Sequence, residues 1–464
     1  MSITASEGGV PAKRPGSVSN EASAARGEGG KKLLRQRFES LLHLLGGNVG
    51  VAIIMFGSIS LAARALGPKD FGAFVLILAI GRVSERLLRF ESWQPLVRFV
   101  AAEEITGDGS KIARLYAYGL LLDIGAAAAA ALVAIAAGFL IGPLIGLESD
   151  QSGLVAIYAV AIACNIRGMS SAALRMAGKF KTLAYIQAIS GLARLGIAFV
   201  LLVNGFGLLG FVVLWAAMQI FDAAIFNVMG WRSLKEQSVP SLFSVSWRGL
   251  PESFPGFLKF AFSTNLSSTL RTLTHEADTL LVGFFVGPAG AGLYFLARRI
   301  AKVAQQVGDL VQMIAYPDLA RLWARADLRD FSRIVKWVQV LLGGFAVAAI
   351  VGIWLLGKPI LGFAFGPEFV AAFPLLIAQL VAVMLILHAA PSRSALLAMD
   401  RPTFVLAVAA LSTAIFFITA FVMIPHFGAI GANFAHIAFG LVTAGLLDAT
   451  LWRDLKLAGK EAER

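Results

Sequence analysis

The chain has little of what most enzymes and soluble proteins need. It contains one cysteine, Cys164, inside an apolar run, so neither a disulfide framework nor a cysteine metal site is available. Its five histidines form no H-x-x-x-H pair, and the sequence has no G-x-S-x-G motif and no G-x-x-x-x-G-K-[ST] run. Charged residues make up only 15% of its 464 residues, against about 25% in a typical soluble domain. ATP-driven transport through a P-loop and zinc or serine hydrolysis are therefore not indicated.

Hydrophobic residues are abundant instead, at 58% of the chain, with a mean hydropathy of +0.77. Apolar runs of about 20 residues, the length of a membrane-spanning helix, recur from Asn48 to Leu451. The net charge is +12, but no basic folded domain is visible, so no nucleic-acid partner is predicted. The composition predicts an all-α polytopic membrane protein.

The apolar runs predict twelve transmembrane helices in two groups of six. The first six are expected near 46–66, 71–99, 115–142, 153–177, 181–204 and 207–230. The other six are expected near 257–285, 289–316, 334–357, 371–398, 403–424 and 428–451. This divides the chain into a disordered tail (1–32), an amphipathic interfacial helix (33–45), a first lobe (46–230), a cytoplasmic linker (231–256), a second lobe (257–451) and a charged tail (452–464).

The distribution of lysine and arginine predicts the orientation. Basic residues gather in the amino tail and in the even-numbered loops, for example Lys179, Arg232 and Arg325, whereas the odd-numbered loops are poor in them. Because basic loops stay in the cytoplasm, both termini are expected there.

An internal repeat relates the two groups of helices. A shift of 220 residues places Gly67, Pro68 and Gly72 on Gly287, Pro288 and Gly292, and a shift of 221 superposes two later Phe-Gly-x-x-Gly turns. Six spans per half is an even number, so the halves enter the membrane in the same direction. The repeat predicts a parallel duplication about an axis along the membrane normal.

Four short motifs occur in an order typical of polysaccharide exporters: the turn Leu66–Gly72, the segment Gly292–Arg298, Pro317 and the turn Phe427–Gly431. From about residue 45 to 455 the chain resembles the O-antigen and capsule flippase branch of the multidrug/oligosaccharidyl-lipid/polysaccharide (MOP) flippase superfamily. The branch that flips the peptidoglycan lipid precursor usually carries two further carboxy-terminal helices, whereas twelve spans are expected here, so this chain is not expected to belong to that branch.

The resemblance implies two six-helix lobes around a V-shaped central cavity. It further implies that an undecaprenyl-pyrophosphate-linked oligosaccharide is moved across the bacterial inner membrane by alternating access. The implied partners are that substrate and the membrane lipids, and whether a polysaccharide polymerase or a chain-length regulator binds the loops is left open.

Basic residues follow helical spacing at equivalent places in both halves. Because charge inside a membrane is costly, such stripes are expected to face a wet cavity, where guanidinium groups can clamp a pyrophosphate. The alternative is that those near the cytoplasmic ends extend to the interface. The candidate substrate-binding residues are Arg82, Arg86, Arg89, Arg271, Arg298, Arg299 and Lys302.

Four carboxylates are candidates for ion coupling: Asp278, Glu276, Asp123 and Asp222. With no cofactor predicted, H⁺, Na⁺ or the membrane potential would supply the energy. The alternative for Asp278 is a structural ion pair with Arg271 or with an arginine of the eighth span. Asp222 and Asp123 are equally able to pair with Arg194 or another buried arginine.

Two other functions compete with the flippase. A polysaccharide polymerase or ligase would need a sizeable periplasmic loop, and every odd loop is short, so no enzyme is predicted. An ion-coupled drug antiporter of the same superfamily would favour acidic walls for cationic drugs, whereas these stripes are mainly basic.

Overall fold

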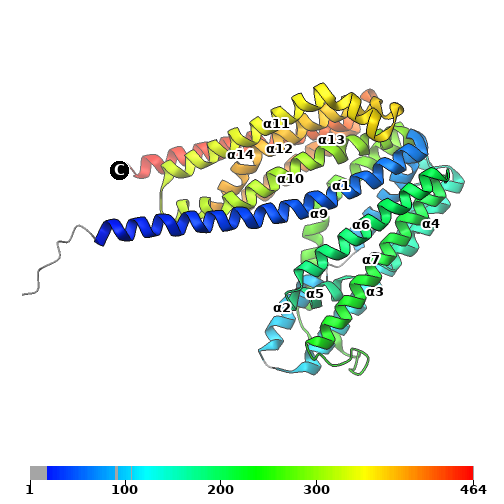
Figure 1. The fold of residues 1–464 in the computed structure, drawn as a ribbon, viewed down its shortest axis with the longest axis horizontal. Helices are drawn as coiled ribbons and strands as arrows, with labels where there is room; N and C mark the ends of the chain where they lie inside the picture. The colour runs from blue at the N-terminus through cyan, green and yellow to red at the C-terminus, as the bar shows by residue number, and fades with distance from the viewer. Residues whose placement is uncertain (1–17, 89–91, 106, 463–464) are drawn as a thin grey trace, which may run out of the picture. The chain divides into compact units, whose positions relative to one another are not determined.

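The computed structural model describes the backbone of residues 18–88, 92–105 and 107–462. Within these ranges the side chains are described too, except those of residues 18–49, 51–52, 180–181, 183–184, 264–275, 309–310, 313–314 and 461–462. The described residues are helical with short connections, which confirms the all-α prediction (Figure 1).

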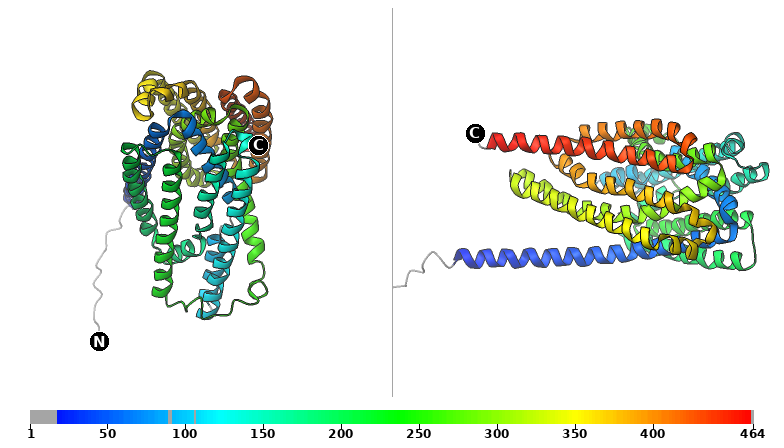
Figure 2. Two further views of the ribbon diagram at one scale, coloured as in Figure 1. Left: turned by 90° about the vertical axis from the view of Figure 1, so that its right-hand side faces the viewer. Right: turned by 90° about the horizontal axis from the view of Figure 1, so that it is seen from above.

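The amino-terminal half contains α1 (Val18–Leu88), α2 (Trp93–Glu104), α3 (Gly109–Leu140), η1 (Pro143–Ile145), α4 (Ser149–Ala163), α5 (Gly168–Met176), α6 (Phe180–Val203) and α7 (Leu208–Glu236). The carboxy-terminal half contains α8 (Leu250–Ser253), α9 (Phe257–Val286), α10 (Pro288–Ala324), α11 (Leu328–Phe365), η2 (Pro367–Ala372), α12 (Phe373–Ala398), α13 (Pro402–Phe427) and α14 (Ala429–Ala462). Helices α3, α4, α6 and α7 run beside one another, as do α11 to α14 (Figures 1 and 2).

The chain divides into two units, Met1–Ile53 and Ile54–Arg464. The first unit contains the amino-terminal part of α1. The tail expected to be disordered as far as residue 32 is helical from Val18, because residues 21–38 are rich in Ala, Glu, Lys, Arg and Leu, which favour helix. All further contacts belong to the second unit.

The repeat is visible in the backbone of the two Gly-Pro turns. Gly67 breaks α1 into two arms at φ 66° and ψ 175°, and Gly287 joins α9 to α10 at φ 89° and ψ −179°. Only glycine adopts such angles readily. At each turn the following proline starts a helix, where its missing N–H costs nothing.

The two turns touch one another. A Cβ on Gly72 would lie 1.8 Å from the Pro288 carbonyl oxygen, and one on Gly292 would lie 3.1 Å from the Pro68 carbonyl oxygen. Each turn therefore uses its glycine to admit the backbone of the other. The repeated segments meet in a pseudo-symmetric contact.

The buried apolar side chains form several separate cores, which can be compared with the two halves of the chain. One core contains residues of both halves, for example Phe71 of α1, Phe211 of α7, and Tyr294 and Phe369 of the carboxy-terminal half. A second core, around Phe331 and Leu447, belongs to the carboxy-terminal half. A third, around Tyr116 and Met169, is mainly amino-terminal but also contains Leu250, Phe254 and Phe257 from α8, the start of α9 and the residues between them. On α3, residues 130–134 belong to the core shared by the two halves, whereas residues 113–120 belong to the mainly amino-terminal one. Apart from the link into α9, the described core residues of the two halves therefore meet near one end of α3.

Side chains of the first arm of α1 bond to the end of α11 near the same turns. The Arg64 Nε donates to the Ala364 carbonyl oxygen at 2.9 Å, and the Ser60 hydroxyl bonds to the same oxygen. Outside the predicted spans, the exposed Lys69 ammonium lies 2.8 Å from the Glu148 carboxylate. The hydrogen bond to Glu148 and its charge raise the pKa of Lys69.

Eight helical segments of the described chain are long and apolar enough to cross a membrane: 109–140, 149–176, 185–203, 208–236, 328–365, 367–398, 402–427 and 429–460. The other four expected spans fall on the more charged α1, α9 and α10. The count of twelve stays a prediction.

Two expected continuous helices are interrupted. The span predicted at 153–177 consists of α4 and α5, with residues 164–167 outside the α-helix. The span predicted at 71–99 contains the second arm of α1, described as far as Leu88, and α2, which begins at Trp93 after the non-helical Ser92. Hydropathy missed the break after α4 because the run is apolar on either side of it.

Candidate functional site

A cavity of about 140 Å³ lies beside the returning limb of the second hairpin. Helix α10 contributes positions 298, 302, 305 and 306, which share one face at helical spacing, and α12 and α14 complete the wall. The lining residues are Arg298, Lys302, Gln305, Gln306, Gln379, Val383, Ile386 and His436.

The carboxylate of Asp278 anchors the cationic side of this cavity from α9. Its Oδ1 lies 2.6 Å from the Arg298 Nη1, and its Oδ2 accepts the Tyr294 hydroxyl at 2.9 Å and lies 3.0 Å from the His436 Nε2. The backbone N–H of Thr279 also donates to Oδ1 at 2.6 Å. Asp278 is fully buried, so it fixes the Arg298 guanidinium in place as a paired buried charge.

Lys302 follows Arg298 by one helical turn and is exposed at the cavity. Gln305 and Gln306 lie beside it, and Gln379 accepts a hydrogen bond of 2.7 Å from Asn433. The cavity thus combines an ammonium group and side-chain amides with the apolar Val383 and Ile386, a set of groups chemically suited to an anion next to hydroxyl groups.

Arg82 brings the amino-terminal half to the same place. Its Nε lies 2.9 Å from the Glu276 Oε2 of α9, and its guanidinium lies 5.6 Å from the ring centroid of Phe295. Arg82 and Arg298 are near enough to Arg299 and Lys302 for their charges to interact. Four of the predicted basic residues therefore gather around Glu276.

A second polar group lies within the amino-terminal half. Arg194 of α6 lies 4.0 Å from Asp222 of α7 and 5.5 Å from the ring centroid of Trp215. The Tyr158 hydroxyl donates to Gln219 at 2.7 Å. Asp222 thus lies beside Arg194, the arginine that the sequence analysis named as its alternative partner.

Of the remaining predicted residues, those that the structure describes are not among the residues that line the cavity. Arg86 is half-buried in α1, and Asp123 of α3 accepts the backbone N–H of Met169 at 2.7 Å. Arg89 lies outside the described residues, and so does the side chain of Arg271. For Asp278, the structure provides the arginine of the eighth span, Arg298, as its ion-pair partner.

The sequence did not single out His436, Tyr294 or Gln379 as parts of this site. The available signal was that His436 and Asn433 lie three residues apart in an apolar helix, where polar side chains face the interior of a bundle. In the described part of the chain, no group of three His, Cys, Asp or Glu side chains is placed to hold a metal ion.

The polysaccharide biosynthesis protein family matches residues 61–374. The chain belongs to this family. It is 24% identical to the inner membrane protein YghQ of Escherichia coli (strain K12) over 329 aligned residues. The aligned region covers 71% of this chain and 92% of YghQ.

The fold is shared with two kinds of solved transporter. The lipid II flippase MurJ in an inward closed conformation matches with a TM-score of 0.67 and 16% identity, over 88% of this chain and 86% of that one. A multidrug resistance MATE family transporter of the MOP superfamily, in an inward-facing conformation, matches with a TM-score of 0.63 and 14% identity. The match covers 89% of this chain and 95% of the transporter. The predicted resemblance is confirmed at the level of the polysaccharide biosynthesis family and of a fold shared with MOP-superfamily transporters, and the chain is a multi-pass membrane protein.

Proposed function

We propose that this protein is a flippase that moves undecaprenyl-pyrophosphate-linked oligosaccharides across the bacterial inner membrane by alternating access, for O-antigen, capsule or exopolysaccharide synthesis. The observation that carries the proposal is the cationic cavity of Arg298 and Lys302, lined with glutamines, in a chain of the polysaccharide biosynthesis family. The inner membrane relative and the lipid II flippase fold support the same function.

The chemistry of the cavity suits such a head group. A pyrophosphate is a concentrated anion, which Lys302 attracts as a point charge and guanidinium groups bind through paired hydrogen bonds. The sugars require hydrogen-bonding amides, which Gln305 and Gln306 supply at the same face. The lipid tail stays in the bilayer while the head group passes along the polar wall.

The cores support alternating access as the mechanism. The largest core joins the halves near the Gly-Pro turns. Beyond it, one core belongs to the carboxy-terminal half and another is amino-terminal except for residues 250–257, at the link into α9. Opening at the turns requires separation of Gly72 from Pro288, together with loss of the bond between Arg64 and Ala364. We place both termini in the cytoplasm, so the joined end faces the periplasm.

The test is transport by Lys302→Gln in vesicles that contain a defined pyrophosphate-linked oligosaccharide. A hydrogen bond to a charged group contributes about 1.5–3 kcal/mol, so transport efficiency should fall about tenfold or more. Lys302→Arg should retain most of it, because the charge is kept.

The matched control is Lys336→Gln, which removes a lysine that lies 5.1 Å from the ring centroid of Trp452, outside the cavity lining. Equal transport by all three variants and the parent would show that the cavity does not bind the head group.

An ion-coupled drug antiporter is the second candidate, because the fold is also that of a MATE family transporter. Its hallmark would be gradient-driven export of cationic dyes from the same vesicles. The basic lining of the cavity disfavours cationic cargo, so we expect no dye export.

A further inference from the structure

Gln379 of α12 presents an oriented amide to the cationic cavity. The side chain lines the cavity and is 5% exposed. Its Oε1 accepts a hydrogen bond of 2.7 Å from the Asn433 Nδ2, so the amide nitrogen is the polar atom that it can offer to a ligand. Among the described residues Gln379 makes no other hydrogen bond. A hydrogen-bond donor of fixed direction therefore lies at the wall of the cavity.

Asn433 of α14 is the residue that orients this amide. Its side chain is fully buried, and within the described part of the chain its Oδ1 has no hydrogen-bond partner. A buried acceptor in this state is costly, so the stabilising contribution of Asn433 is the bond that its Nδ2 makes to Gln379. His436, three residues further along α14, lies 3.0 Å from the Asp278 carboxylate that holds Arg298. Helix α14 thus orients both a cationic and an amide donor of the cavity.

Apolar side chains follow Gln379 along the same face of α12. Val383 and Ile386 lie four and seven residues after it and also line the cavity, because this spacing places all three side chains on one side of a helix. The cationic Arg298 and Lys302 belong to α10 instead. The α10 side of the cavity therefore suits a phosphate, whereas the α12 side combines an amide donor with aliphatic surface.

The size of the cavity limits which part of a glycan reaches the α12 side. At about 140 Å³ the cavity is smaller than a typical small-molecule pocket of about 300 Å³ or more, so it holds only part of an oligosaccharide. In the proposed flippase, a pyrophosphate bound at Lys302 brings the sugar that it carries into the same cavity. That first sugar is thus the part of the glycan nearest to Gln379.

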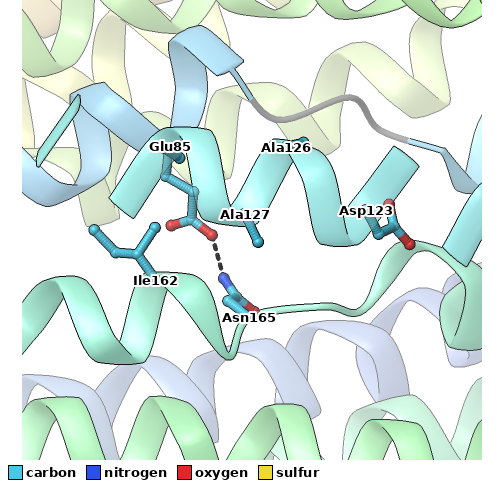
Figure 3. Close-up of a pocket in the computed structure, with 7 residues that line it drawn as sticks. Glu85, Asp123, Ala126, Ala127, Ile162 and Asn165 are labelled. Atoms are coloured by element: carbon cyan, nitrogen blue, oxygen red, sulfur yellow. Dashed lines mark hydrogen bonds between the residues drawn. The ribbon is translucent and has the colours of Figure 1, made fainter. Parts of the chain in front are cut away.

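A smaller cavity beside the break after α4 does not compete for a sugar substituent (Figure 3). Its volume is about 10 Å³, which is room for about one water molecule. Asn165 and Glu85, which line it, are hydrogen-bonded to each other (Figure 3). A sugar substituent fits the larger cavity and not this one.

We propose that Gln379 recognises an N-acetyl group on the sugar attached to the pyrophosphate, with Asn433 as its positioning residue. A carbonyl oxygen only accepts hydrogen bonds, as the Gln379 N–H requires, whereas a hydroxyl group both donates and accepts and so adapts to either end of a glutamine. The acetamido methyl group packs against Val383 and Ile386. A carboxylate would accept the same hydrogen bond but would be desolvated by these aliphatic side chains. This role of Gln379 rests on the proposed flippase function, because it assigns one group of the same substrate.

The test compares the flipping of two lipids, undecaprenyl pyrophosphate linked to N-acetylglucosamine and to glucose, in vesicles that contain the purified full-length protein. One uncharged hydrogen bond changes an affinity about three- to tenfold, so the parent should flip the N-acetylated lipid more efficiently by that factor. Gln379→Glu keeps an acceptor for the Asn433 Nδ2 but presents an oxygen to the cavity in place of the N–H. This variant should lose the preference, whatever its absolute rate.

Asn433→Leu tests the positioning residue, because it frees the Gln379 amide to rotate and should lower the same preference. The ratio of the two rates is measured within one protein, so a general loss of stability or transport does not change it. The matched control is Gln219→Glu, at a glutamine outside the cavity lining whose Oε1 accepts the Tyr158 hydroxyl at 2.7 Å. It should keep the parental preference.

Equal rates for the two lipids in the parent would overturn this role of Gln379 and leave the flippase proposal standing. A parental preference in both Gln379→Glu and Asn433→Leu would overturn it too, because recognition would then lie at other residues. A folded parent that moves neither lipid would refute the proposed function itself, and the role of Gln379 with it.

Discussion

Asp278 and Arg298 form a buried pair on which the geometry of the cavity depends. Both oxygens of the carboxylate are engaged, by Arg298 and Thr279 on one side and by Tyr294 and His436 on the other. A carboxylate bound in this way orients the arginine that lines the cavity. Its first role is therefore to position the Arg298 guanidinium at the cavity.

Removal of this carboxylate should be strongly destabilising. Asp278→Ala leaves Arg298 buried without its counter-ion, so the free energy of unfolding should fall by about 3–5 kcal/mol. Denaturation in mixed micelles measures the change, and the double variant Asp278→Ala, Arg298→Met should recover part of it.

Asp222→Ala serves as the control, because the contact between Asp222 and Arg194 is longer, at 4.0 Å. The free energy of unfolding should therefore fall less than in Asp278→Ala. If Asp278→Asn abolished transport while the free energy of unfolding stayed unchanged, the positioning role would be wrong and a coupling role would be favoured.

Individual charges were easier to predict from the sequence than their partners. Helical spacing and hydropathy identified Arg82, Arg298 and Lys302, because charge within an apolar run is conspicuous. The partners of Asp278 come from α10 and α14, so only the folded chain shows that His436 and Tyr294 meet it.

At the scale of elements, the contact between the two Gly-Pro turns joins the halves. The α-carbon hydrogens of Gly72 and Gly292 face backbone atoms of the opposite turn, which cannot move aside as a flexible side chain can. The repeat predicted the equivalence of these turns, but the contact between them required the structure. The break after α4 was not predictable from the sequence either, because Asn165 and Arg167 are the only polar residues of that stretch and the run around them is apolar.

Gly72→Ala should separate the two turns. The added Cβ would lie 1.8 Å from the Pro288 carbonyl oxygen, so α1 and α10 must move apart. Spin labels on Lys69→Cys and Glu368→Cys, two exposed positions near the turns, should report a longer distance by double electron–electron resonance in a Cys164→Ser background.

The control is Gly125→Ala, since a Cβ there meets nothing within 4 Å. An unchanged label distance in Gly72→Ala, equal to that of the control, would show that the turns do not hold the halves together.

At the scale of the whole molecule, the fold and family were predictable from the sequence, because a repeated Gly-Pro turn in a long apolar chain is distinctive. Residues 61–374 match the polysaccharide biosynthesis family, and MurJ and a MATE transporter share the fold. The identity of the glycan was not predictable, because glutamines that bind sugars have the same pattern in sequence as glutamines that pack between helices.

The orientation of the chain can be tested by labelling in intact cells. Glu148→Cys, in a Cys164→Ser background, lies at the loop that contacts Lys69 and should react with a membrane-impermeant maleimide added outside spheroplasts. Arg325→Cys, at the exposed end of α10, should react only after lysis. The opposite pattern would invert the topology and place the joined end of the halves in the cytoplasm.

The central claim is that the cationic cavity selects a lipid-linked anion. The most direct measurement compares flipping of one oligosaccharide on two carriers, undecaprenyl pyrophosphate and an uncharged polyprenyl lipid, in vesicles that contain the purified protein. A lost charge-assisted contact is worth about 1.5–3 kcal/mol, so the pyrophosphate-linked form should be flipped about tenfold faster or more. Equal rates for the two carriers would contradict the account.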